Sequence, residues 1–120
     1  MSDNQLVKIS KVFAIDIIDL CETIKNRKKA SAIVNQLLRS GTSIGANIHE
    51  ANYASGKADF INKFQIALKE CYETEYWLEL FLKAQLLPAD TVSPLLHDCG
   101  SIRRMLVSSV NTAKQNQSQT

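Results

Sequence analysis

The side chains best suited to metal binding or catalysis are the two histidines and their neighbours. His49 and Glu50 resemble the start of the HExxH zinc motif, but the second histidine would fall at position 53, which is a tyrosine. His97 and Cys99 are two residues apart, so on a helix they point to different faces and make a poor ligand pair. Neither pair predicts a metal site.

A cluster of four glutamates between positions 70 and 79 invites comparison with di-iron helical bundles. Those sites combine glutamates with Glu-x-x-His motifs on paired helices. Neither histidine here has a glutamate three positions before it. The sequence therefore predicts no catalytic residue, no metal, no cofactor and no small-molecule substrate, and the chain is expected not to be an enzyme.

The composition indicates one globular domain. The chain has 120 residues, 45% hydrophobic and 22% charged, with a formal net charge of +2. The first ten residues lack the features of a signal peptide, and no stretch approaches the roughly 20 apolar residues of a membrane span. Three cysteines without CxxC spacing favour buried free thiols. We expect a cytoplasmic protein with no membrane partner.

Four segments carry apolar residues three or four positions apart, which is the spacing of one helical face. Short connections between helices favour antiparallel neighbours, so the predicted fold is an all-α, up-and-down antiparallel four-helix bundle. It forms a single domain over residues 1–115, followed by a frayed polar tail over 116–120. The predicted helices cover residues 3–25, 30–54, 58–86 and 89–114.

The ends of these segments carry typical boundary residues. Asp3 is a plausible cap for the first helix, and Ser55 for the third. Gly56 offers the left-handed conformation that ends many helices. Because proline is tolerated in the first turn of a helix but not in its interior, Pro94 leaves two starts open for the fourth helix, residue 89 or a position near Ser93.

The second helix contains an unusual run of small residues around Gly41 and Gly45. Each glycine costs a helix interior about 1 kcal/mol relative to alanine. A phosphate-binding loop is a poor alternative, because its motif requires a preceding strand and a lysine that this run lacks. We expect the small residues to let a neighbouring backbone approach closely.

Polar residues form a narrow stripe on the opposite face of the second helix: Arg39, Ser43, Asn47 and Glu50. A solvated face is one interpretation. A hydrogen-bonded seam against another helix or subunit is the other, because the guanidinium fork of arginine matches a carboxylate. On the third helix Glu75 lies near the core face and needs a partner. We therefore expect Glu75, or Glu73 beside it, to pair with Arg39.

The third helix has a second apolar stripe away from its core face: Ile66, Trp77, Leu80 and Ala84. A monomeric bundle usually shows one apolar stripe per helix and a charged back. Burial between subunits would explain the stripe, and a broad core that uses both faces is the alternative. The stripe predicts a homo-oligomer interface.

Basic residues that could contact nucleic acid lie in two places: Lys25, Arg27, Lys28 and Lys29 between the first two helices, and Arg103 and Arg104 on the fourth. A solvated helix connection is the alternative for the first group. Self-association would repeat the basic cluster and create a multivalent charged surface. Binding to RNA or DNA would then depend on backbone charge rather than on base sequence.

Two stretches of the chain resemble a known family. They are residues 36–51, QLLRSGTSIGANIHEA, and residues 66–78, IALKECYETEYWL. The pattern Arg-x-x-x-Ser-Ile-x-x-Asn-Ile-x-Glu is similar to that of bacterial four-helix bundle proteins encoded in intervening sequences of large-subunit ribosomal RNA genes. The accessory variability determinant of diversity-generating retroelements is a relative. The resemblance covers residues 20–106.

The resemblance implies an up-and-down bundle that assembles as a ring-like homopentamer. It also implies that Arg39, Asn47, Glu50 and Glu75 occupy the recurrent polar positions of the family. The accessory determinant is basic and is associated with nucleic acid and a reverse transcriptase, whereas the charge of +2 here is modest. We therefore predict a non-enzymatic scaffold that contacts RNA or DNA. The alternative is a protein–protein adaptor without nucleic-acid binding.

Overall fold

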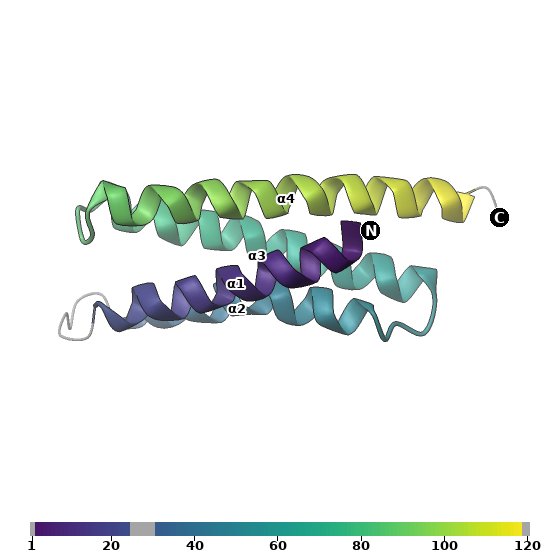
Figure 1. The fold of residues 1–120 in the computed structure, drawn as a ribbon, viewed down its shortest axis with the longest axis horizontal. Coiled ribbons are helices and arrows are strands. Elements are labelled where there is room, and N and C mark those ends of the chain that lie inside the picture. Colours follow the sequence, from purple (N-terminus) through teal and green to yellow (C-terminus); the bar gives the residue numbers. More distant parts are fainter. Residues whose placement is uncertain (1, 25–30, 119–120) are drawn as a thin grey trace.

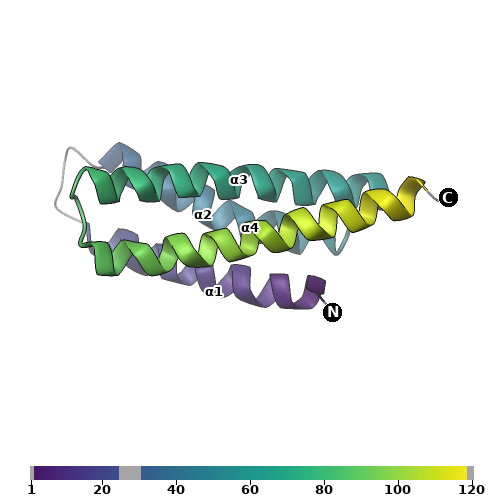
Figure 2. The same ribbon diagram turned by 90° about the horizontal axis from the view of Figure 1, so that it is seen from above.

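A computed structural model describes residues 2–24 and 31–118. Within those ranges it contains four α-helices and no strand. Figures 1 and 2 show the helices running alternately up and down, which confirms the predicted all-α bundle. The helices are α1 (Ser2–Glu22), α2 (Ser31–Ala51), α3 (Lys57–Lys83) and α4 (Ala89–Ser118).

The bundle is long and narrow, measuring 53 × 21 × 19 Å along its principal axes. Each helix packs against the next one in the chain, and α4 closes the bundle against α1. The helices α1 and α3 therefore occupy opposite corners, and so do α2 and α4. The longest helix, α4, extends beyond the start of α1 (Figure 1) and continues into the segment expected to be a polar tail.

Apolar rows from all four helices meet along the bundle axis and form one core. Burial of such side chains is the main stabilising contribution to a bundle of this kind. Most of the apolar residues that repeat along α1, α2 and α4 lie inside, with Ile9, Ile33 and Leu96 packed at the edge of the core, and α3 contributes Ile61 and Phe81. The largest fully buried side chains include Phe13, Phe64, Phe81, Leu37, Leu78 and Leu106.

Two boundary predictions between α2 and α3 are wrong. Gly56 has φ 177° and ψ −177°, an extended rather than a left-handed conformation, and it precedes α3 without a side-chain capping bond. Ser55 does not cap the helix. Instead its backbone N–H donates to the Asp59 carboxylate at 3.1 Å, and its hydroxyl lies 3.5 Å from the same oxygen. The acidic side chain in the first turn thus reaches back past the N-cap Gly56 to the residue before it.

The first helix begins at Ser2, one residue before the expected cap Asp3. The fourth begins at Ala89, the earlier of the two starts left open by the sequence, with Pro94 inside it. The early start is possible for two reasons. The Pro88 carbonyl accepts hydrogen bonds from the first turn of the helix. Pro94 cannot donate to the carbonyl four residues earlier, but this side of the helix is exposed, so water can reach that carbonyl.

The end of α3 uses a left-handed residue that is not glycine. Gln85 has φ 58°. The N–H of Leu86 donates to the Phe81 carbonyl at 3.0 Å, and that of Gln85 donates to the Leu82 carbonyl at 3.1 Å. These two bonds form a Schellman motif, whose left-handed position usually holds glycine.

The small residues of α2 permit close packing against α1, as predicted. A Cβ atom at Gly41 would lie 2.9 Å from two side-chain carbons of Ile17, and one at Gly45 would lie 3.3 Å from the Ser10 carbonyl oxygen. Real Cβ contacts essentially never fall below 3.0 Å. The glycines therefore set the distance between these two helices.

Candidate functional site

The polar cluster between α2 and α3 is centred on Arg39. Its guanidinium donates to the Glu70 carboxylate at 2.9 Å and also to Glu73. The Trp77 indole N–H donates to the same Glu73 oxygen at 3.0 Å. The predicted pairing of Arg39 with Glu73 is therefore confirmed, and Glu70 joins the pair from the previous turn of α3.

The electrostatics of this cluster favour its charged form. The hydrogen bond from Trp77, followed by the contact with Arg39, lowers the pKa of Glu73. The same contact with Glu73 raises the pKa of Arg39. The Glu70 side chain is only 12% exposed, against 49% for Arg39, so the arginine holds a largely buried carboxylate from the solvent side.

The pairing of Arg39 with Glu75, which was the first of the two predicted, is wrong within one copy of the chain. Glu75 faces α4, where its carboxylate accepts a hydrogen bond of 2.6 Å from Nε of Arg103. Arg103 also lies over the Tyr72 ring, 5.6 Å from its centroid, which is within the range of a cation–π contact. Two residues along a helix turn the side chain by about 200°, so Glu73 and Glu75 reach different neighbours.

The rest of the predicted polar stripe serves its own helix or the surface. The Ser43 hydroxyl donates to the Arg39 carbonyl, and the Asn47 amide donates to the Ser43 carbonyl. Glu50 forms an exposed ion pair of 3.4 Å with Lys63 of α3. The stripe is thus a close inter-helix seam at Arg39, and a looser one at Glu50.

One sequence motif in α2 was not recognised from the sequence. Gly41, Ser43 and Gly45 have the Gly-x-Ser-x-Gly spacing of the hydrolase nucleophile elbow. That motif requires a sharp turn between a strand and a helix. Here the residues lie in the middle of α2, and the Ser43 hydroxyl bonds to the backbone one turn earlier. The pattern therefore reflects close packing rather than a nucleophile.

A buried polar pair was also missed. The Thr74 hydroxyl of α3 donates to the Ser40 hydroxyl of α2 at 2.9 Å, and both residues are fully buried. This contact lies next to the Arg39 cluster along the same seam. Buried hydroxyls require partners, but neither residue type marks a core position in a sequence.

The outer face of α3 carries the predicted interface residues and two aromatic residues that were not predicted. Ile66 is 37% exposed and Ala84 is exposed, whereas Trp77 and Leu80 are half-buried. Tyr72 and Tyr76 also point outward, about 120° and 80° around α3 from Ile66, and are 54% and 57% exposed. A search for exposed aromatic residues one turn apart would have identified them.

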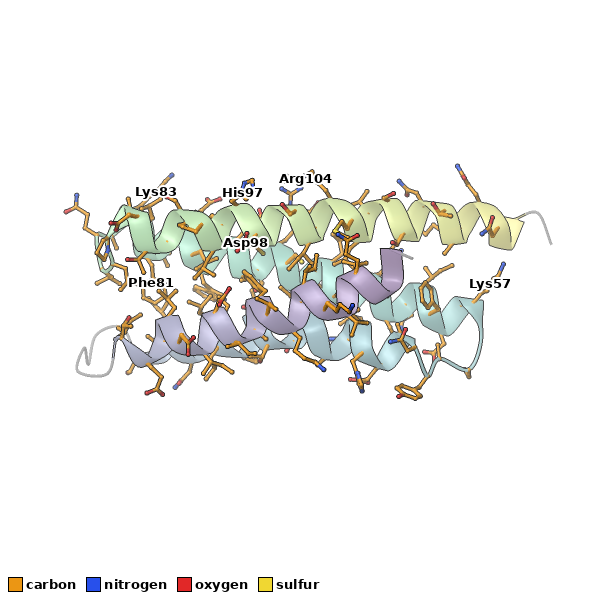
Figure 3. The ribbon with its side chains drawn as sticks, in the orientation of Figure 1. Lys57, Phe81, Lys83, His97, Asp98 and Arg104 are labelled. Carbon is orange, nitrogen blue, oxygen red and sulfur yellow. The ribbon has the colours of Figure 1, made fainter. Side chains whose placement is uncertain are left out.

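The two arginines predicted to contact nucleic acid lie in different environments. Arg103 is held by Glu75 and Tyr72, and the hydrogen bond with Glu75 raises its pKa. Arg104 points away from the bundle on the same side of α4 as His97 (Figure 3), and it donates to the Ser101 hydroxyl at 3.2 Å. The remaining candidates, Lys25, Arg27, Lys28 and Lys29, lie outside the described residues.

The cysteines are buried free thiols, as predicted. Burial, followed by the nearby Glu22 charge, raises the pKa of Cys21 to about 11. The hydrogen bond with Cys71, together with burial, raises the pKa of Cys99 as well. Among residues 2–24 and 31–118, no group of three or more His, Cys, Asp and Glu side chains is placed to hold a metal ion. None of the helices described is both long and apolar enough to cross a membrane.

Comparison with known proteins identifies relatives over most of the chain. Residues 2–108 match the family described as 23S rRNA-intervening sequence protein. A crystal structure from Bacteroides thetaiotaomicron, of a protein with unknown function from the S23 ribosomal protein family, is 43% identical with a TM-score of 0.88. The match covers 92% of this chain and 99% of that one. No curated protein matches the sequence.

Proposed function

This chain belongs to the 23S rRNA-intervening sequence protein family, and from that premise we propose that it is a non-enzymatic, self-associating scaffold that contacts RNA. The members of the family share a fold, and the function must be argued from surfaces. Two features matter: the outer face of α3, and the basic residues that lie between the first two helices in the sequence and on α4. The proposed location is the cytoplasm.

The outer face of α3 is the observation that supports self-association best. Tyr72 and Tyr76 are more than half exposed one turn apart. Arginines flank them on both sides, Arg39 from α2 and Arg103 from α4, each fixed by carboxylates of α3. Aromatic residues and arginine are enriched at the centres of protein interfaces. Because these side chains are already held in place, docking costs little conformational entropy.

Contact with RNA would follow from the assembly. One copy contributes a modest basic cluster, Lys25, Arg27, Lys28 and Lys29, together with the exposed Arg104. Several copies in one ring, five according to the resemblance described above, would repeat that cluster and raise the avidity for a polyanion. Such binding reads phosphates rather than bases, and its affinity falls steeply with salt.

A protein–protein adaptor is the second candidate, and a specific observation favours it. Arg39 and Arg103 are both neutralised by glutamates, which leaves fewer free cations on the described helices for phosphate contacts. An adaptor would dock a different protein on the α3 face and bind no nucleic acid.

Titration with labelled RNA separates the two candidates. Purified protein is titrated with a hairpin from a 23S intervening sequence and with duplex DNA, at low and at physiological salt. The variant neutralises the four basic residues from Lys25 to Lys29. The control neutralises Lys57, Lys69 and Lys83, three exposed lysines of α3. Loss of affinity in the first variant alone supports RNA contact. If neither the wild type nor the control variant binds RNA or DNA at low salt, RNA contact is overturned and the adaptor remains.

Sedimentation of the same proteins tests self-association. An Ile66→Lys, Tyr76→Lys double variant places two charges in the α3 face, and it is expected to sediment as a smaller species than the wild type. Circular dichroism verifies its fold. A wild-type protein that stays monomeric at all concentrations would overturn the scaffold.

A further inference from the structure

Gly100 stands in the interior of α4, where glycine is unfavourable relative to alanine. The close approach of α1 explains Gly41 and Gly45, but helix packing does not explain this glycine. A Cβ atom placed at Gly100 would meet no neighbouring helix in the described part of the chain. It would instead lie 3.3 Å from Nη1 of Arg104 and 3.6 Å from Nη2 of Arg103, both on α4 itself. The glycine therefore keeps open a notch between two guanidinium groups.

The two arginines converge on this notch because long side chains on a helix lean toward its N-terminus. They stand three and four positions after Gly100, so they flank it on one face of the helix. Both nitrogens lie close to the same point, so their separation does not exceed the sum of the two distances above. Two charge-assisted hydrogen bonds of about 2.8 Å, with the width of a phosphate group between them, can span such a gap.

Both guanidinium groups have donors that face the notch. Arg103 uses Nε for its hydrogen bond of 2.6 Å to Glu75, and Nη2 is the atom beside Gly100. Arg104 donates from Nη2 to the Ser101 hydroxyl, and Nη1 is the atom beside Gly100. In the part of the chain that the structure describes, no carboxylate lies within ion-pair distance of Arg104. An anion in the notch would therefore supply the partner that Arg104 lacks.

The charges around the notch indicate which anion fits. Arg103, Arg104 and Glu75 together carry one net positive charge. Each internal phosphodiester of a nucleic-acid backbone carries one negative charge, whereas a phosphate monoester carries nearly two at neutral pH. The charge balance therefore favours a diester. The exposed His97 lies on the same side of α4 as Arg104 (Figure 3), where its ring can add a donor at the edge of the notch.

We propose that Arg103 and Arg104 clamp one backbone phosphate of RNA in the notch at Gly100. The clamp rests on the RNA contact proposed above, and it gives that contact a defined position on the described helices. Glu75 acts as a positioning residue, because it holds Nε of Arg103 and leaves the outer edge of the guanidinium toward the notch. Since Arg104 and Gly100 belong to α4, they can be changed without altering the residues of the α3 face.

Substitution of Arg104 tests the charge in the clamp. Arg104→Gln removes one phosphate contact, so the slope of log affinity against log salt for the same RNA hairpin should fall by about one. Arg104→Lys keeps the charge but loses the planar fork, and it should recover only part of the affinity. The matched control is Lys57→Gln, which removes an exposed charge at the far end of α3 (Figure 3) and should bind like the wild type.

Substitution of Gly100 tests the shape of the notch with every charge kept. Gly100→Ala places a methyl group against Nη1 of Arg104. Its affinity for the hairpin should fall about tenfold, which corresponds to the loss of one charge-assisted hydrogen bond. Its thermal midpoint should rise, because alanine favours the helix. A change that acted only by damaging the fold would lower both, so opposite movements point to the clamp. Sedimentation should show wild-type self-association in both the Gly100 and the Arg104 variants.

The outcomes separate the clamp from RNA contact as a whole. A wild-type protein that binds no RNA overturns both. If the wild type binds and the Arg104 and Gly100 variants match Lys57→Gln, the clamp alone is overturned, and the contact passes to the cluster from Lys25 to Lys29. A loss in Arg104→Gln without one in Gly100→Ala also overturns the clamp, because a diffuse charge would give that result. Displacement of the hairpin by millimolar inorganic phosphate at constant ionic strength would overturn the assignment to a diester.

Discussion

Replacing Arg39 with methionine tests whether the ion-pair cluster stabilises the contact between α2 and α3. Methionine keeps most of the apolar stem and removes the guanidinium. The Glu70 carboxylate, only 12% exposed, then loses its ion-pair partner, and Glu73 keeps the Trp77 indole.

The magnitude follows from burial. Exposed ion pairs contribute about 0–1 kcal/mol, whereas removing one partner of a fully buried pair costs about 3–5 kcal/mol. The cluster lies between these limits, because Arg39 is half exposed and Glu70 is nearly buried. We expect Arg39→Met to lower the free energy of unfolding by about 2 kcal/mol, which is a large share of the stability of a small domain.

Urea unfolding followed by circular dichroism measures the change. All proteins are compared at one low concentration, because self-association would add to apparent stability. The control is Glu50→Gln, which removes the exposed pair with Lys63 and is expected to cost less than about 0.5 kcal/mol. The reasoning is refuted if Arg39→Met unfolds at the same urea concentration as that control with an unchanged m-value.

Four further changes have expected outcomes. Gly41→Ala drives a Cβ into Ile17; despite the better helix propensity it should lower the unfolding free energy by about 1 kcal/mol, and urea melts should show a smaller additional loss when the same change is made in an Ile17→Ala background, where the space is free. Gln85→Gly relieves a left-handed φ of 58° and should raise the thermal midpoint, corresponding to about 0.5–1 kcal/mol; a lower midpoint would contradict it. The pKa of Glu73 is lowered on folding, so its contribution is present above about pH 4.3 and disappears as pH falls through the folded-state pKa; Glu73→Gln should flatten the acid limb of a stability–pH curve. The three buried thiols should resist alkylation at pH 8 until denaturant is added, and rapid labelling of the native protein, read by mass spectrometry, would contradict their burial.

The helix count and the antiparallel topology could be predicted because they depend on local patterns. Apolar residues repeat every three or four positions in each segment, and Gly41 and Gly45 stand where a helix would otherwise avoid glycine. The structure gives the reason in the close approach of α1. Helix ends were predicted less well. Glycine can end one helix or precede the next, and the sequence does not show which. The φ angle of Gly56 in the structure shows that it precedes α3.

The pairing of charges could be predicted only in part, because it depends on how each helix is rotated about its axis. The sequence favoured Glu75 over Glu73 as the partner of Arg39. They separate only when α3 is placed between α2 and α4, so that one faces each neighbour. Glu70 was missed because a carboxylate within an apolar row is not expected to be nearly buried. Its burial is tolerated because Arg39 reaches it from the surface.

These pairs explain how α3 presents its outer face. Apolar rows alone tolerate small rotations and shifts, because any aliphatic neighbour can replace another. The carboxylates of α3 are held from both sides, by Arg39 of α2 and by Arg103 of α4. A rotation of α3 by one residue, about 100°, would break both contacts at once. The face bearing Tyr72 and Tyr76 is therefore fixed by charge pairs on its two flanks, and loss of either arginine should impair self-association through α3 even where the bundle still folds.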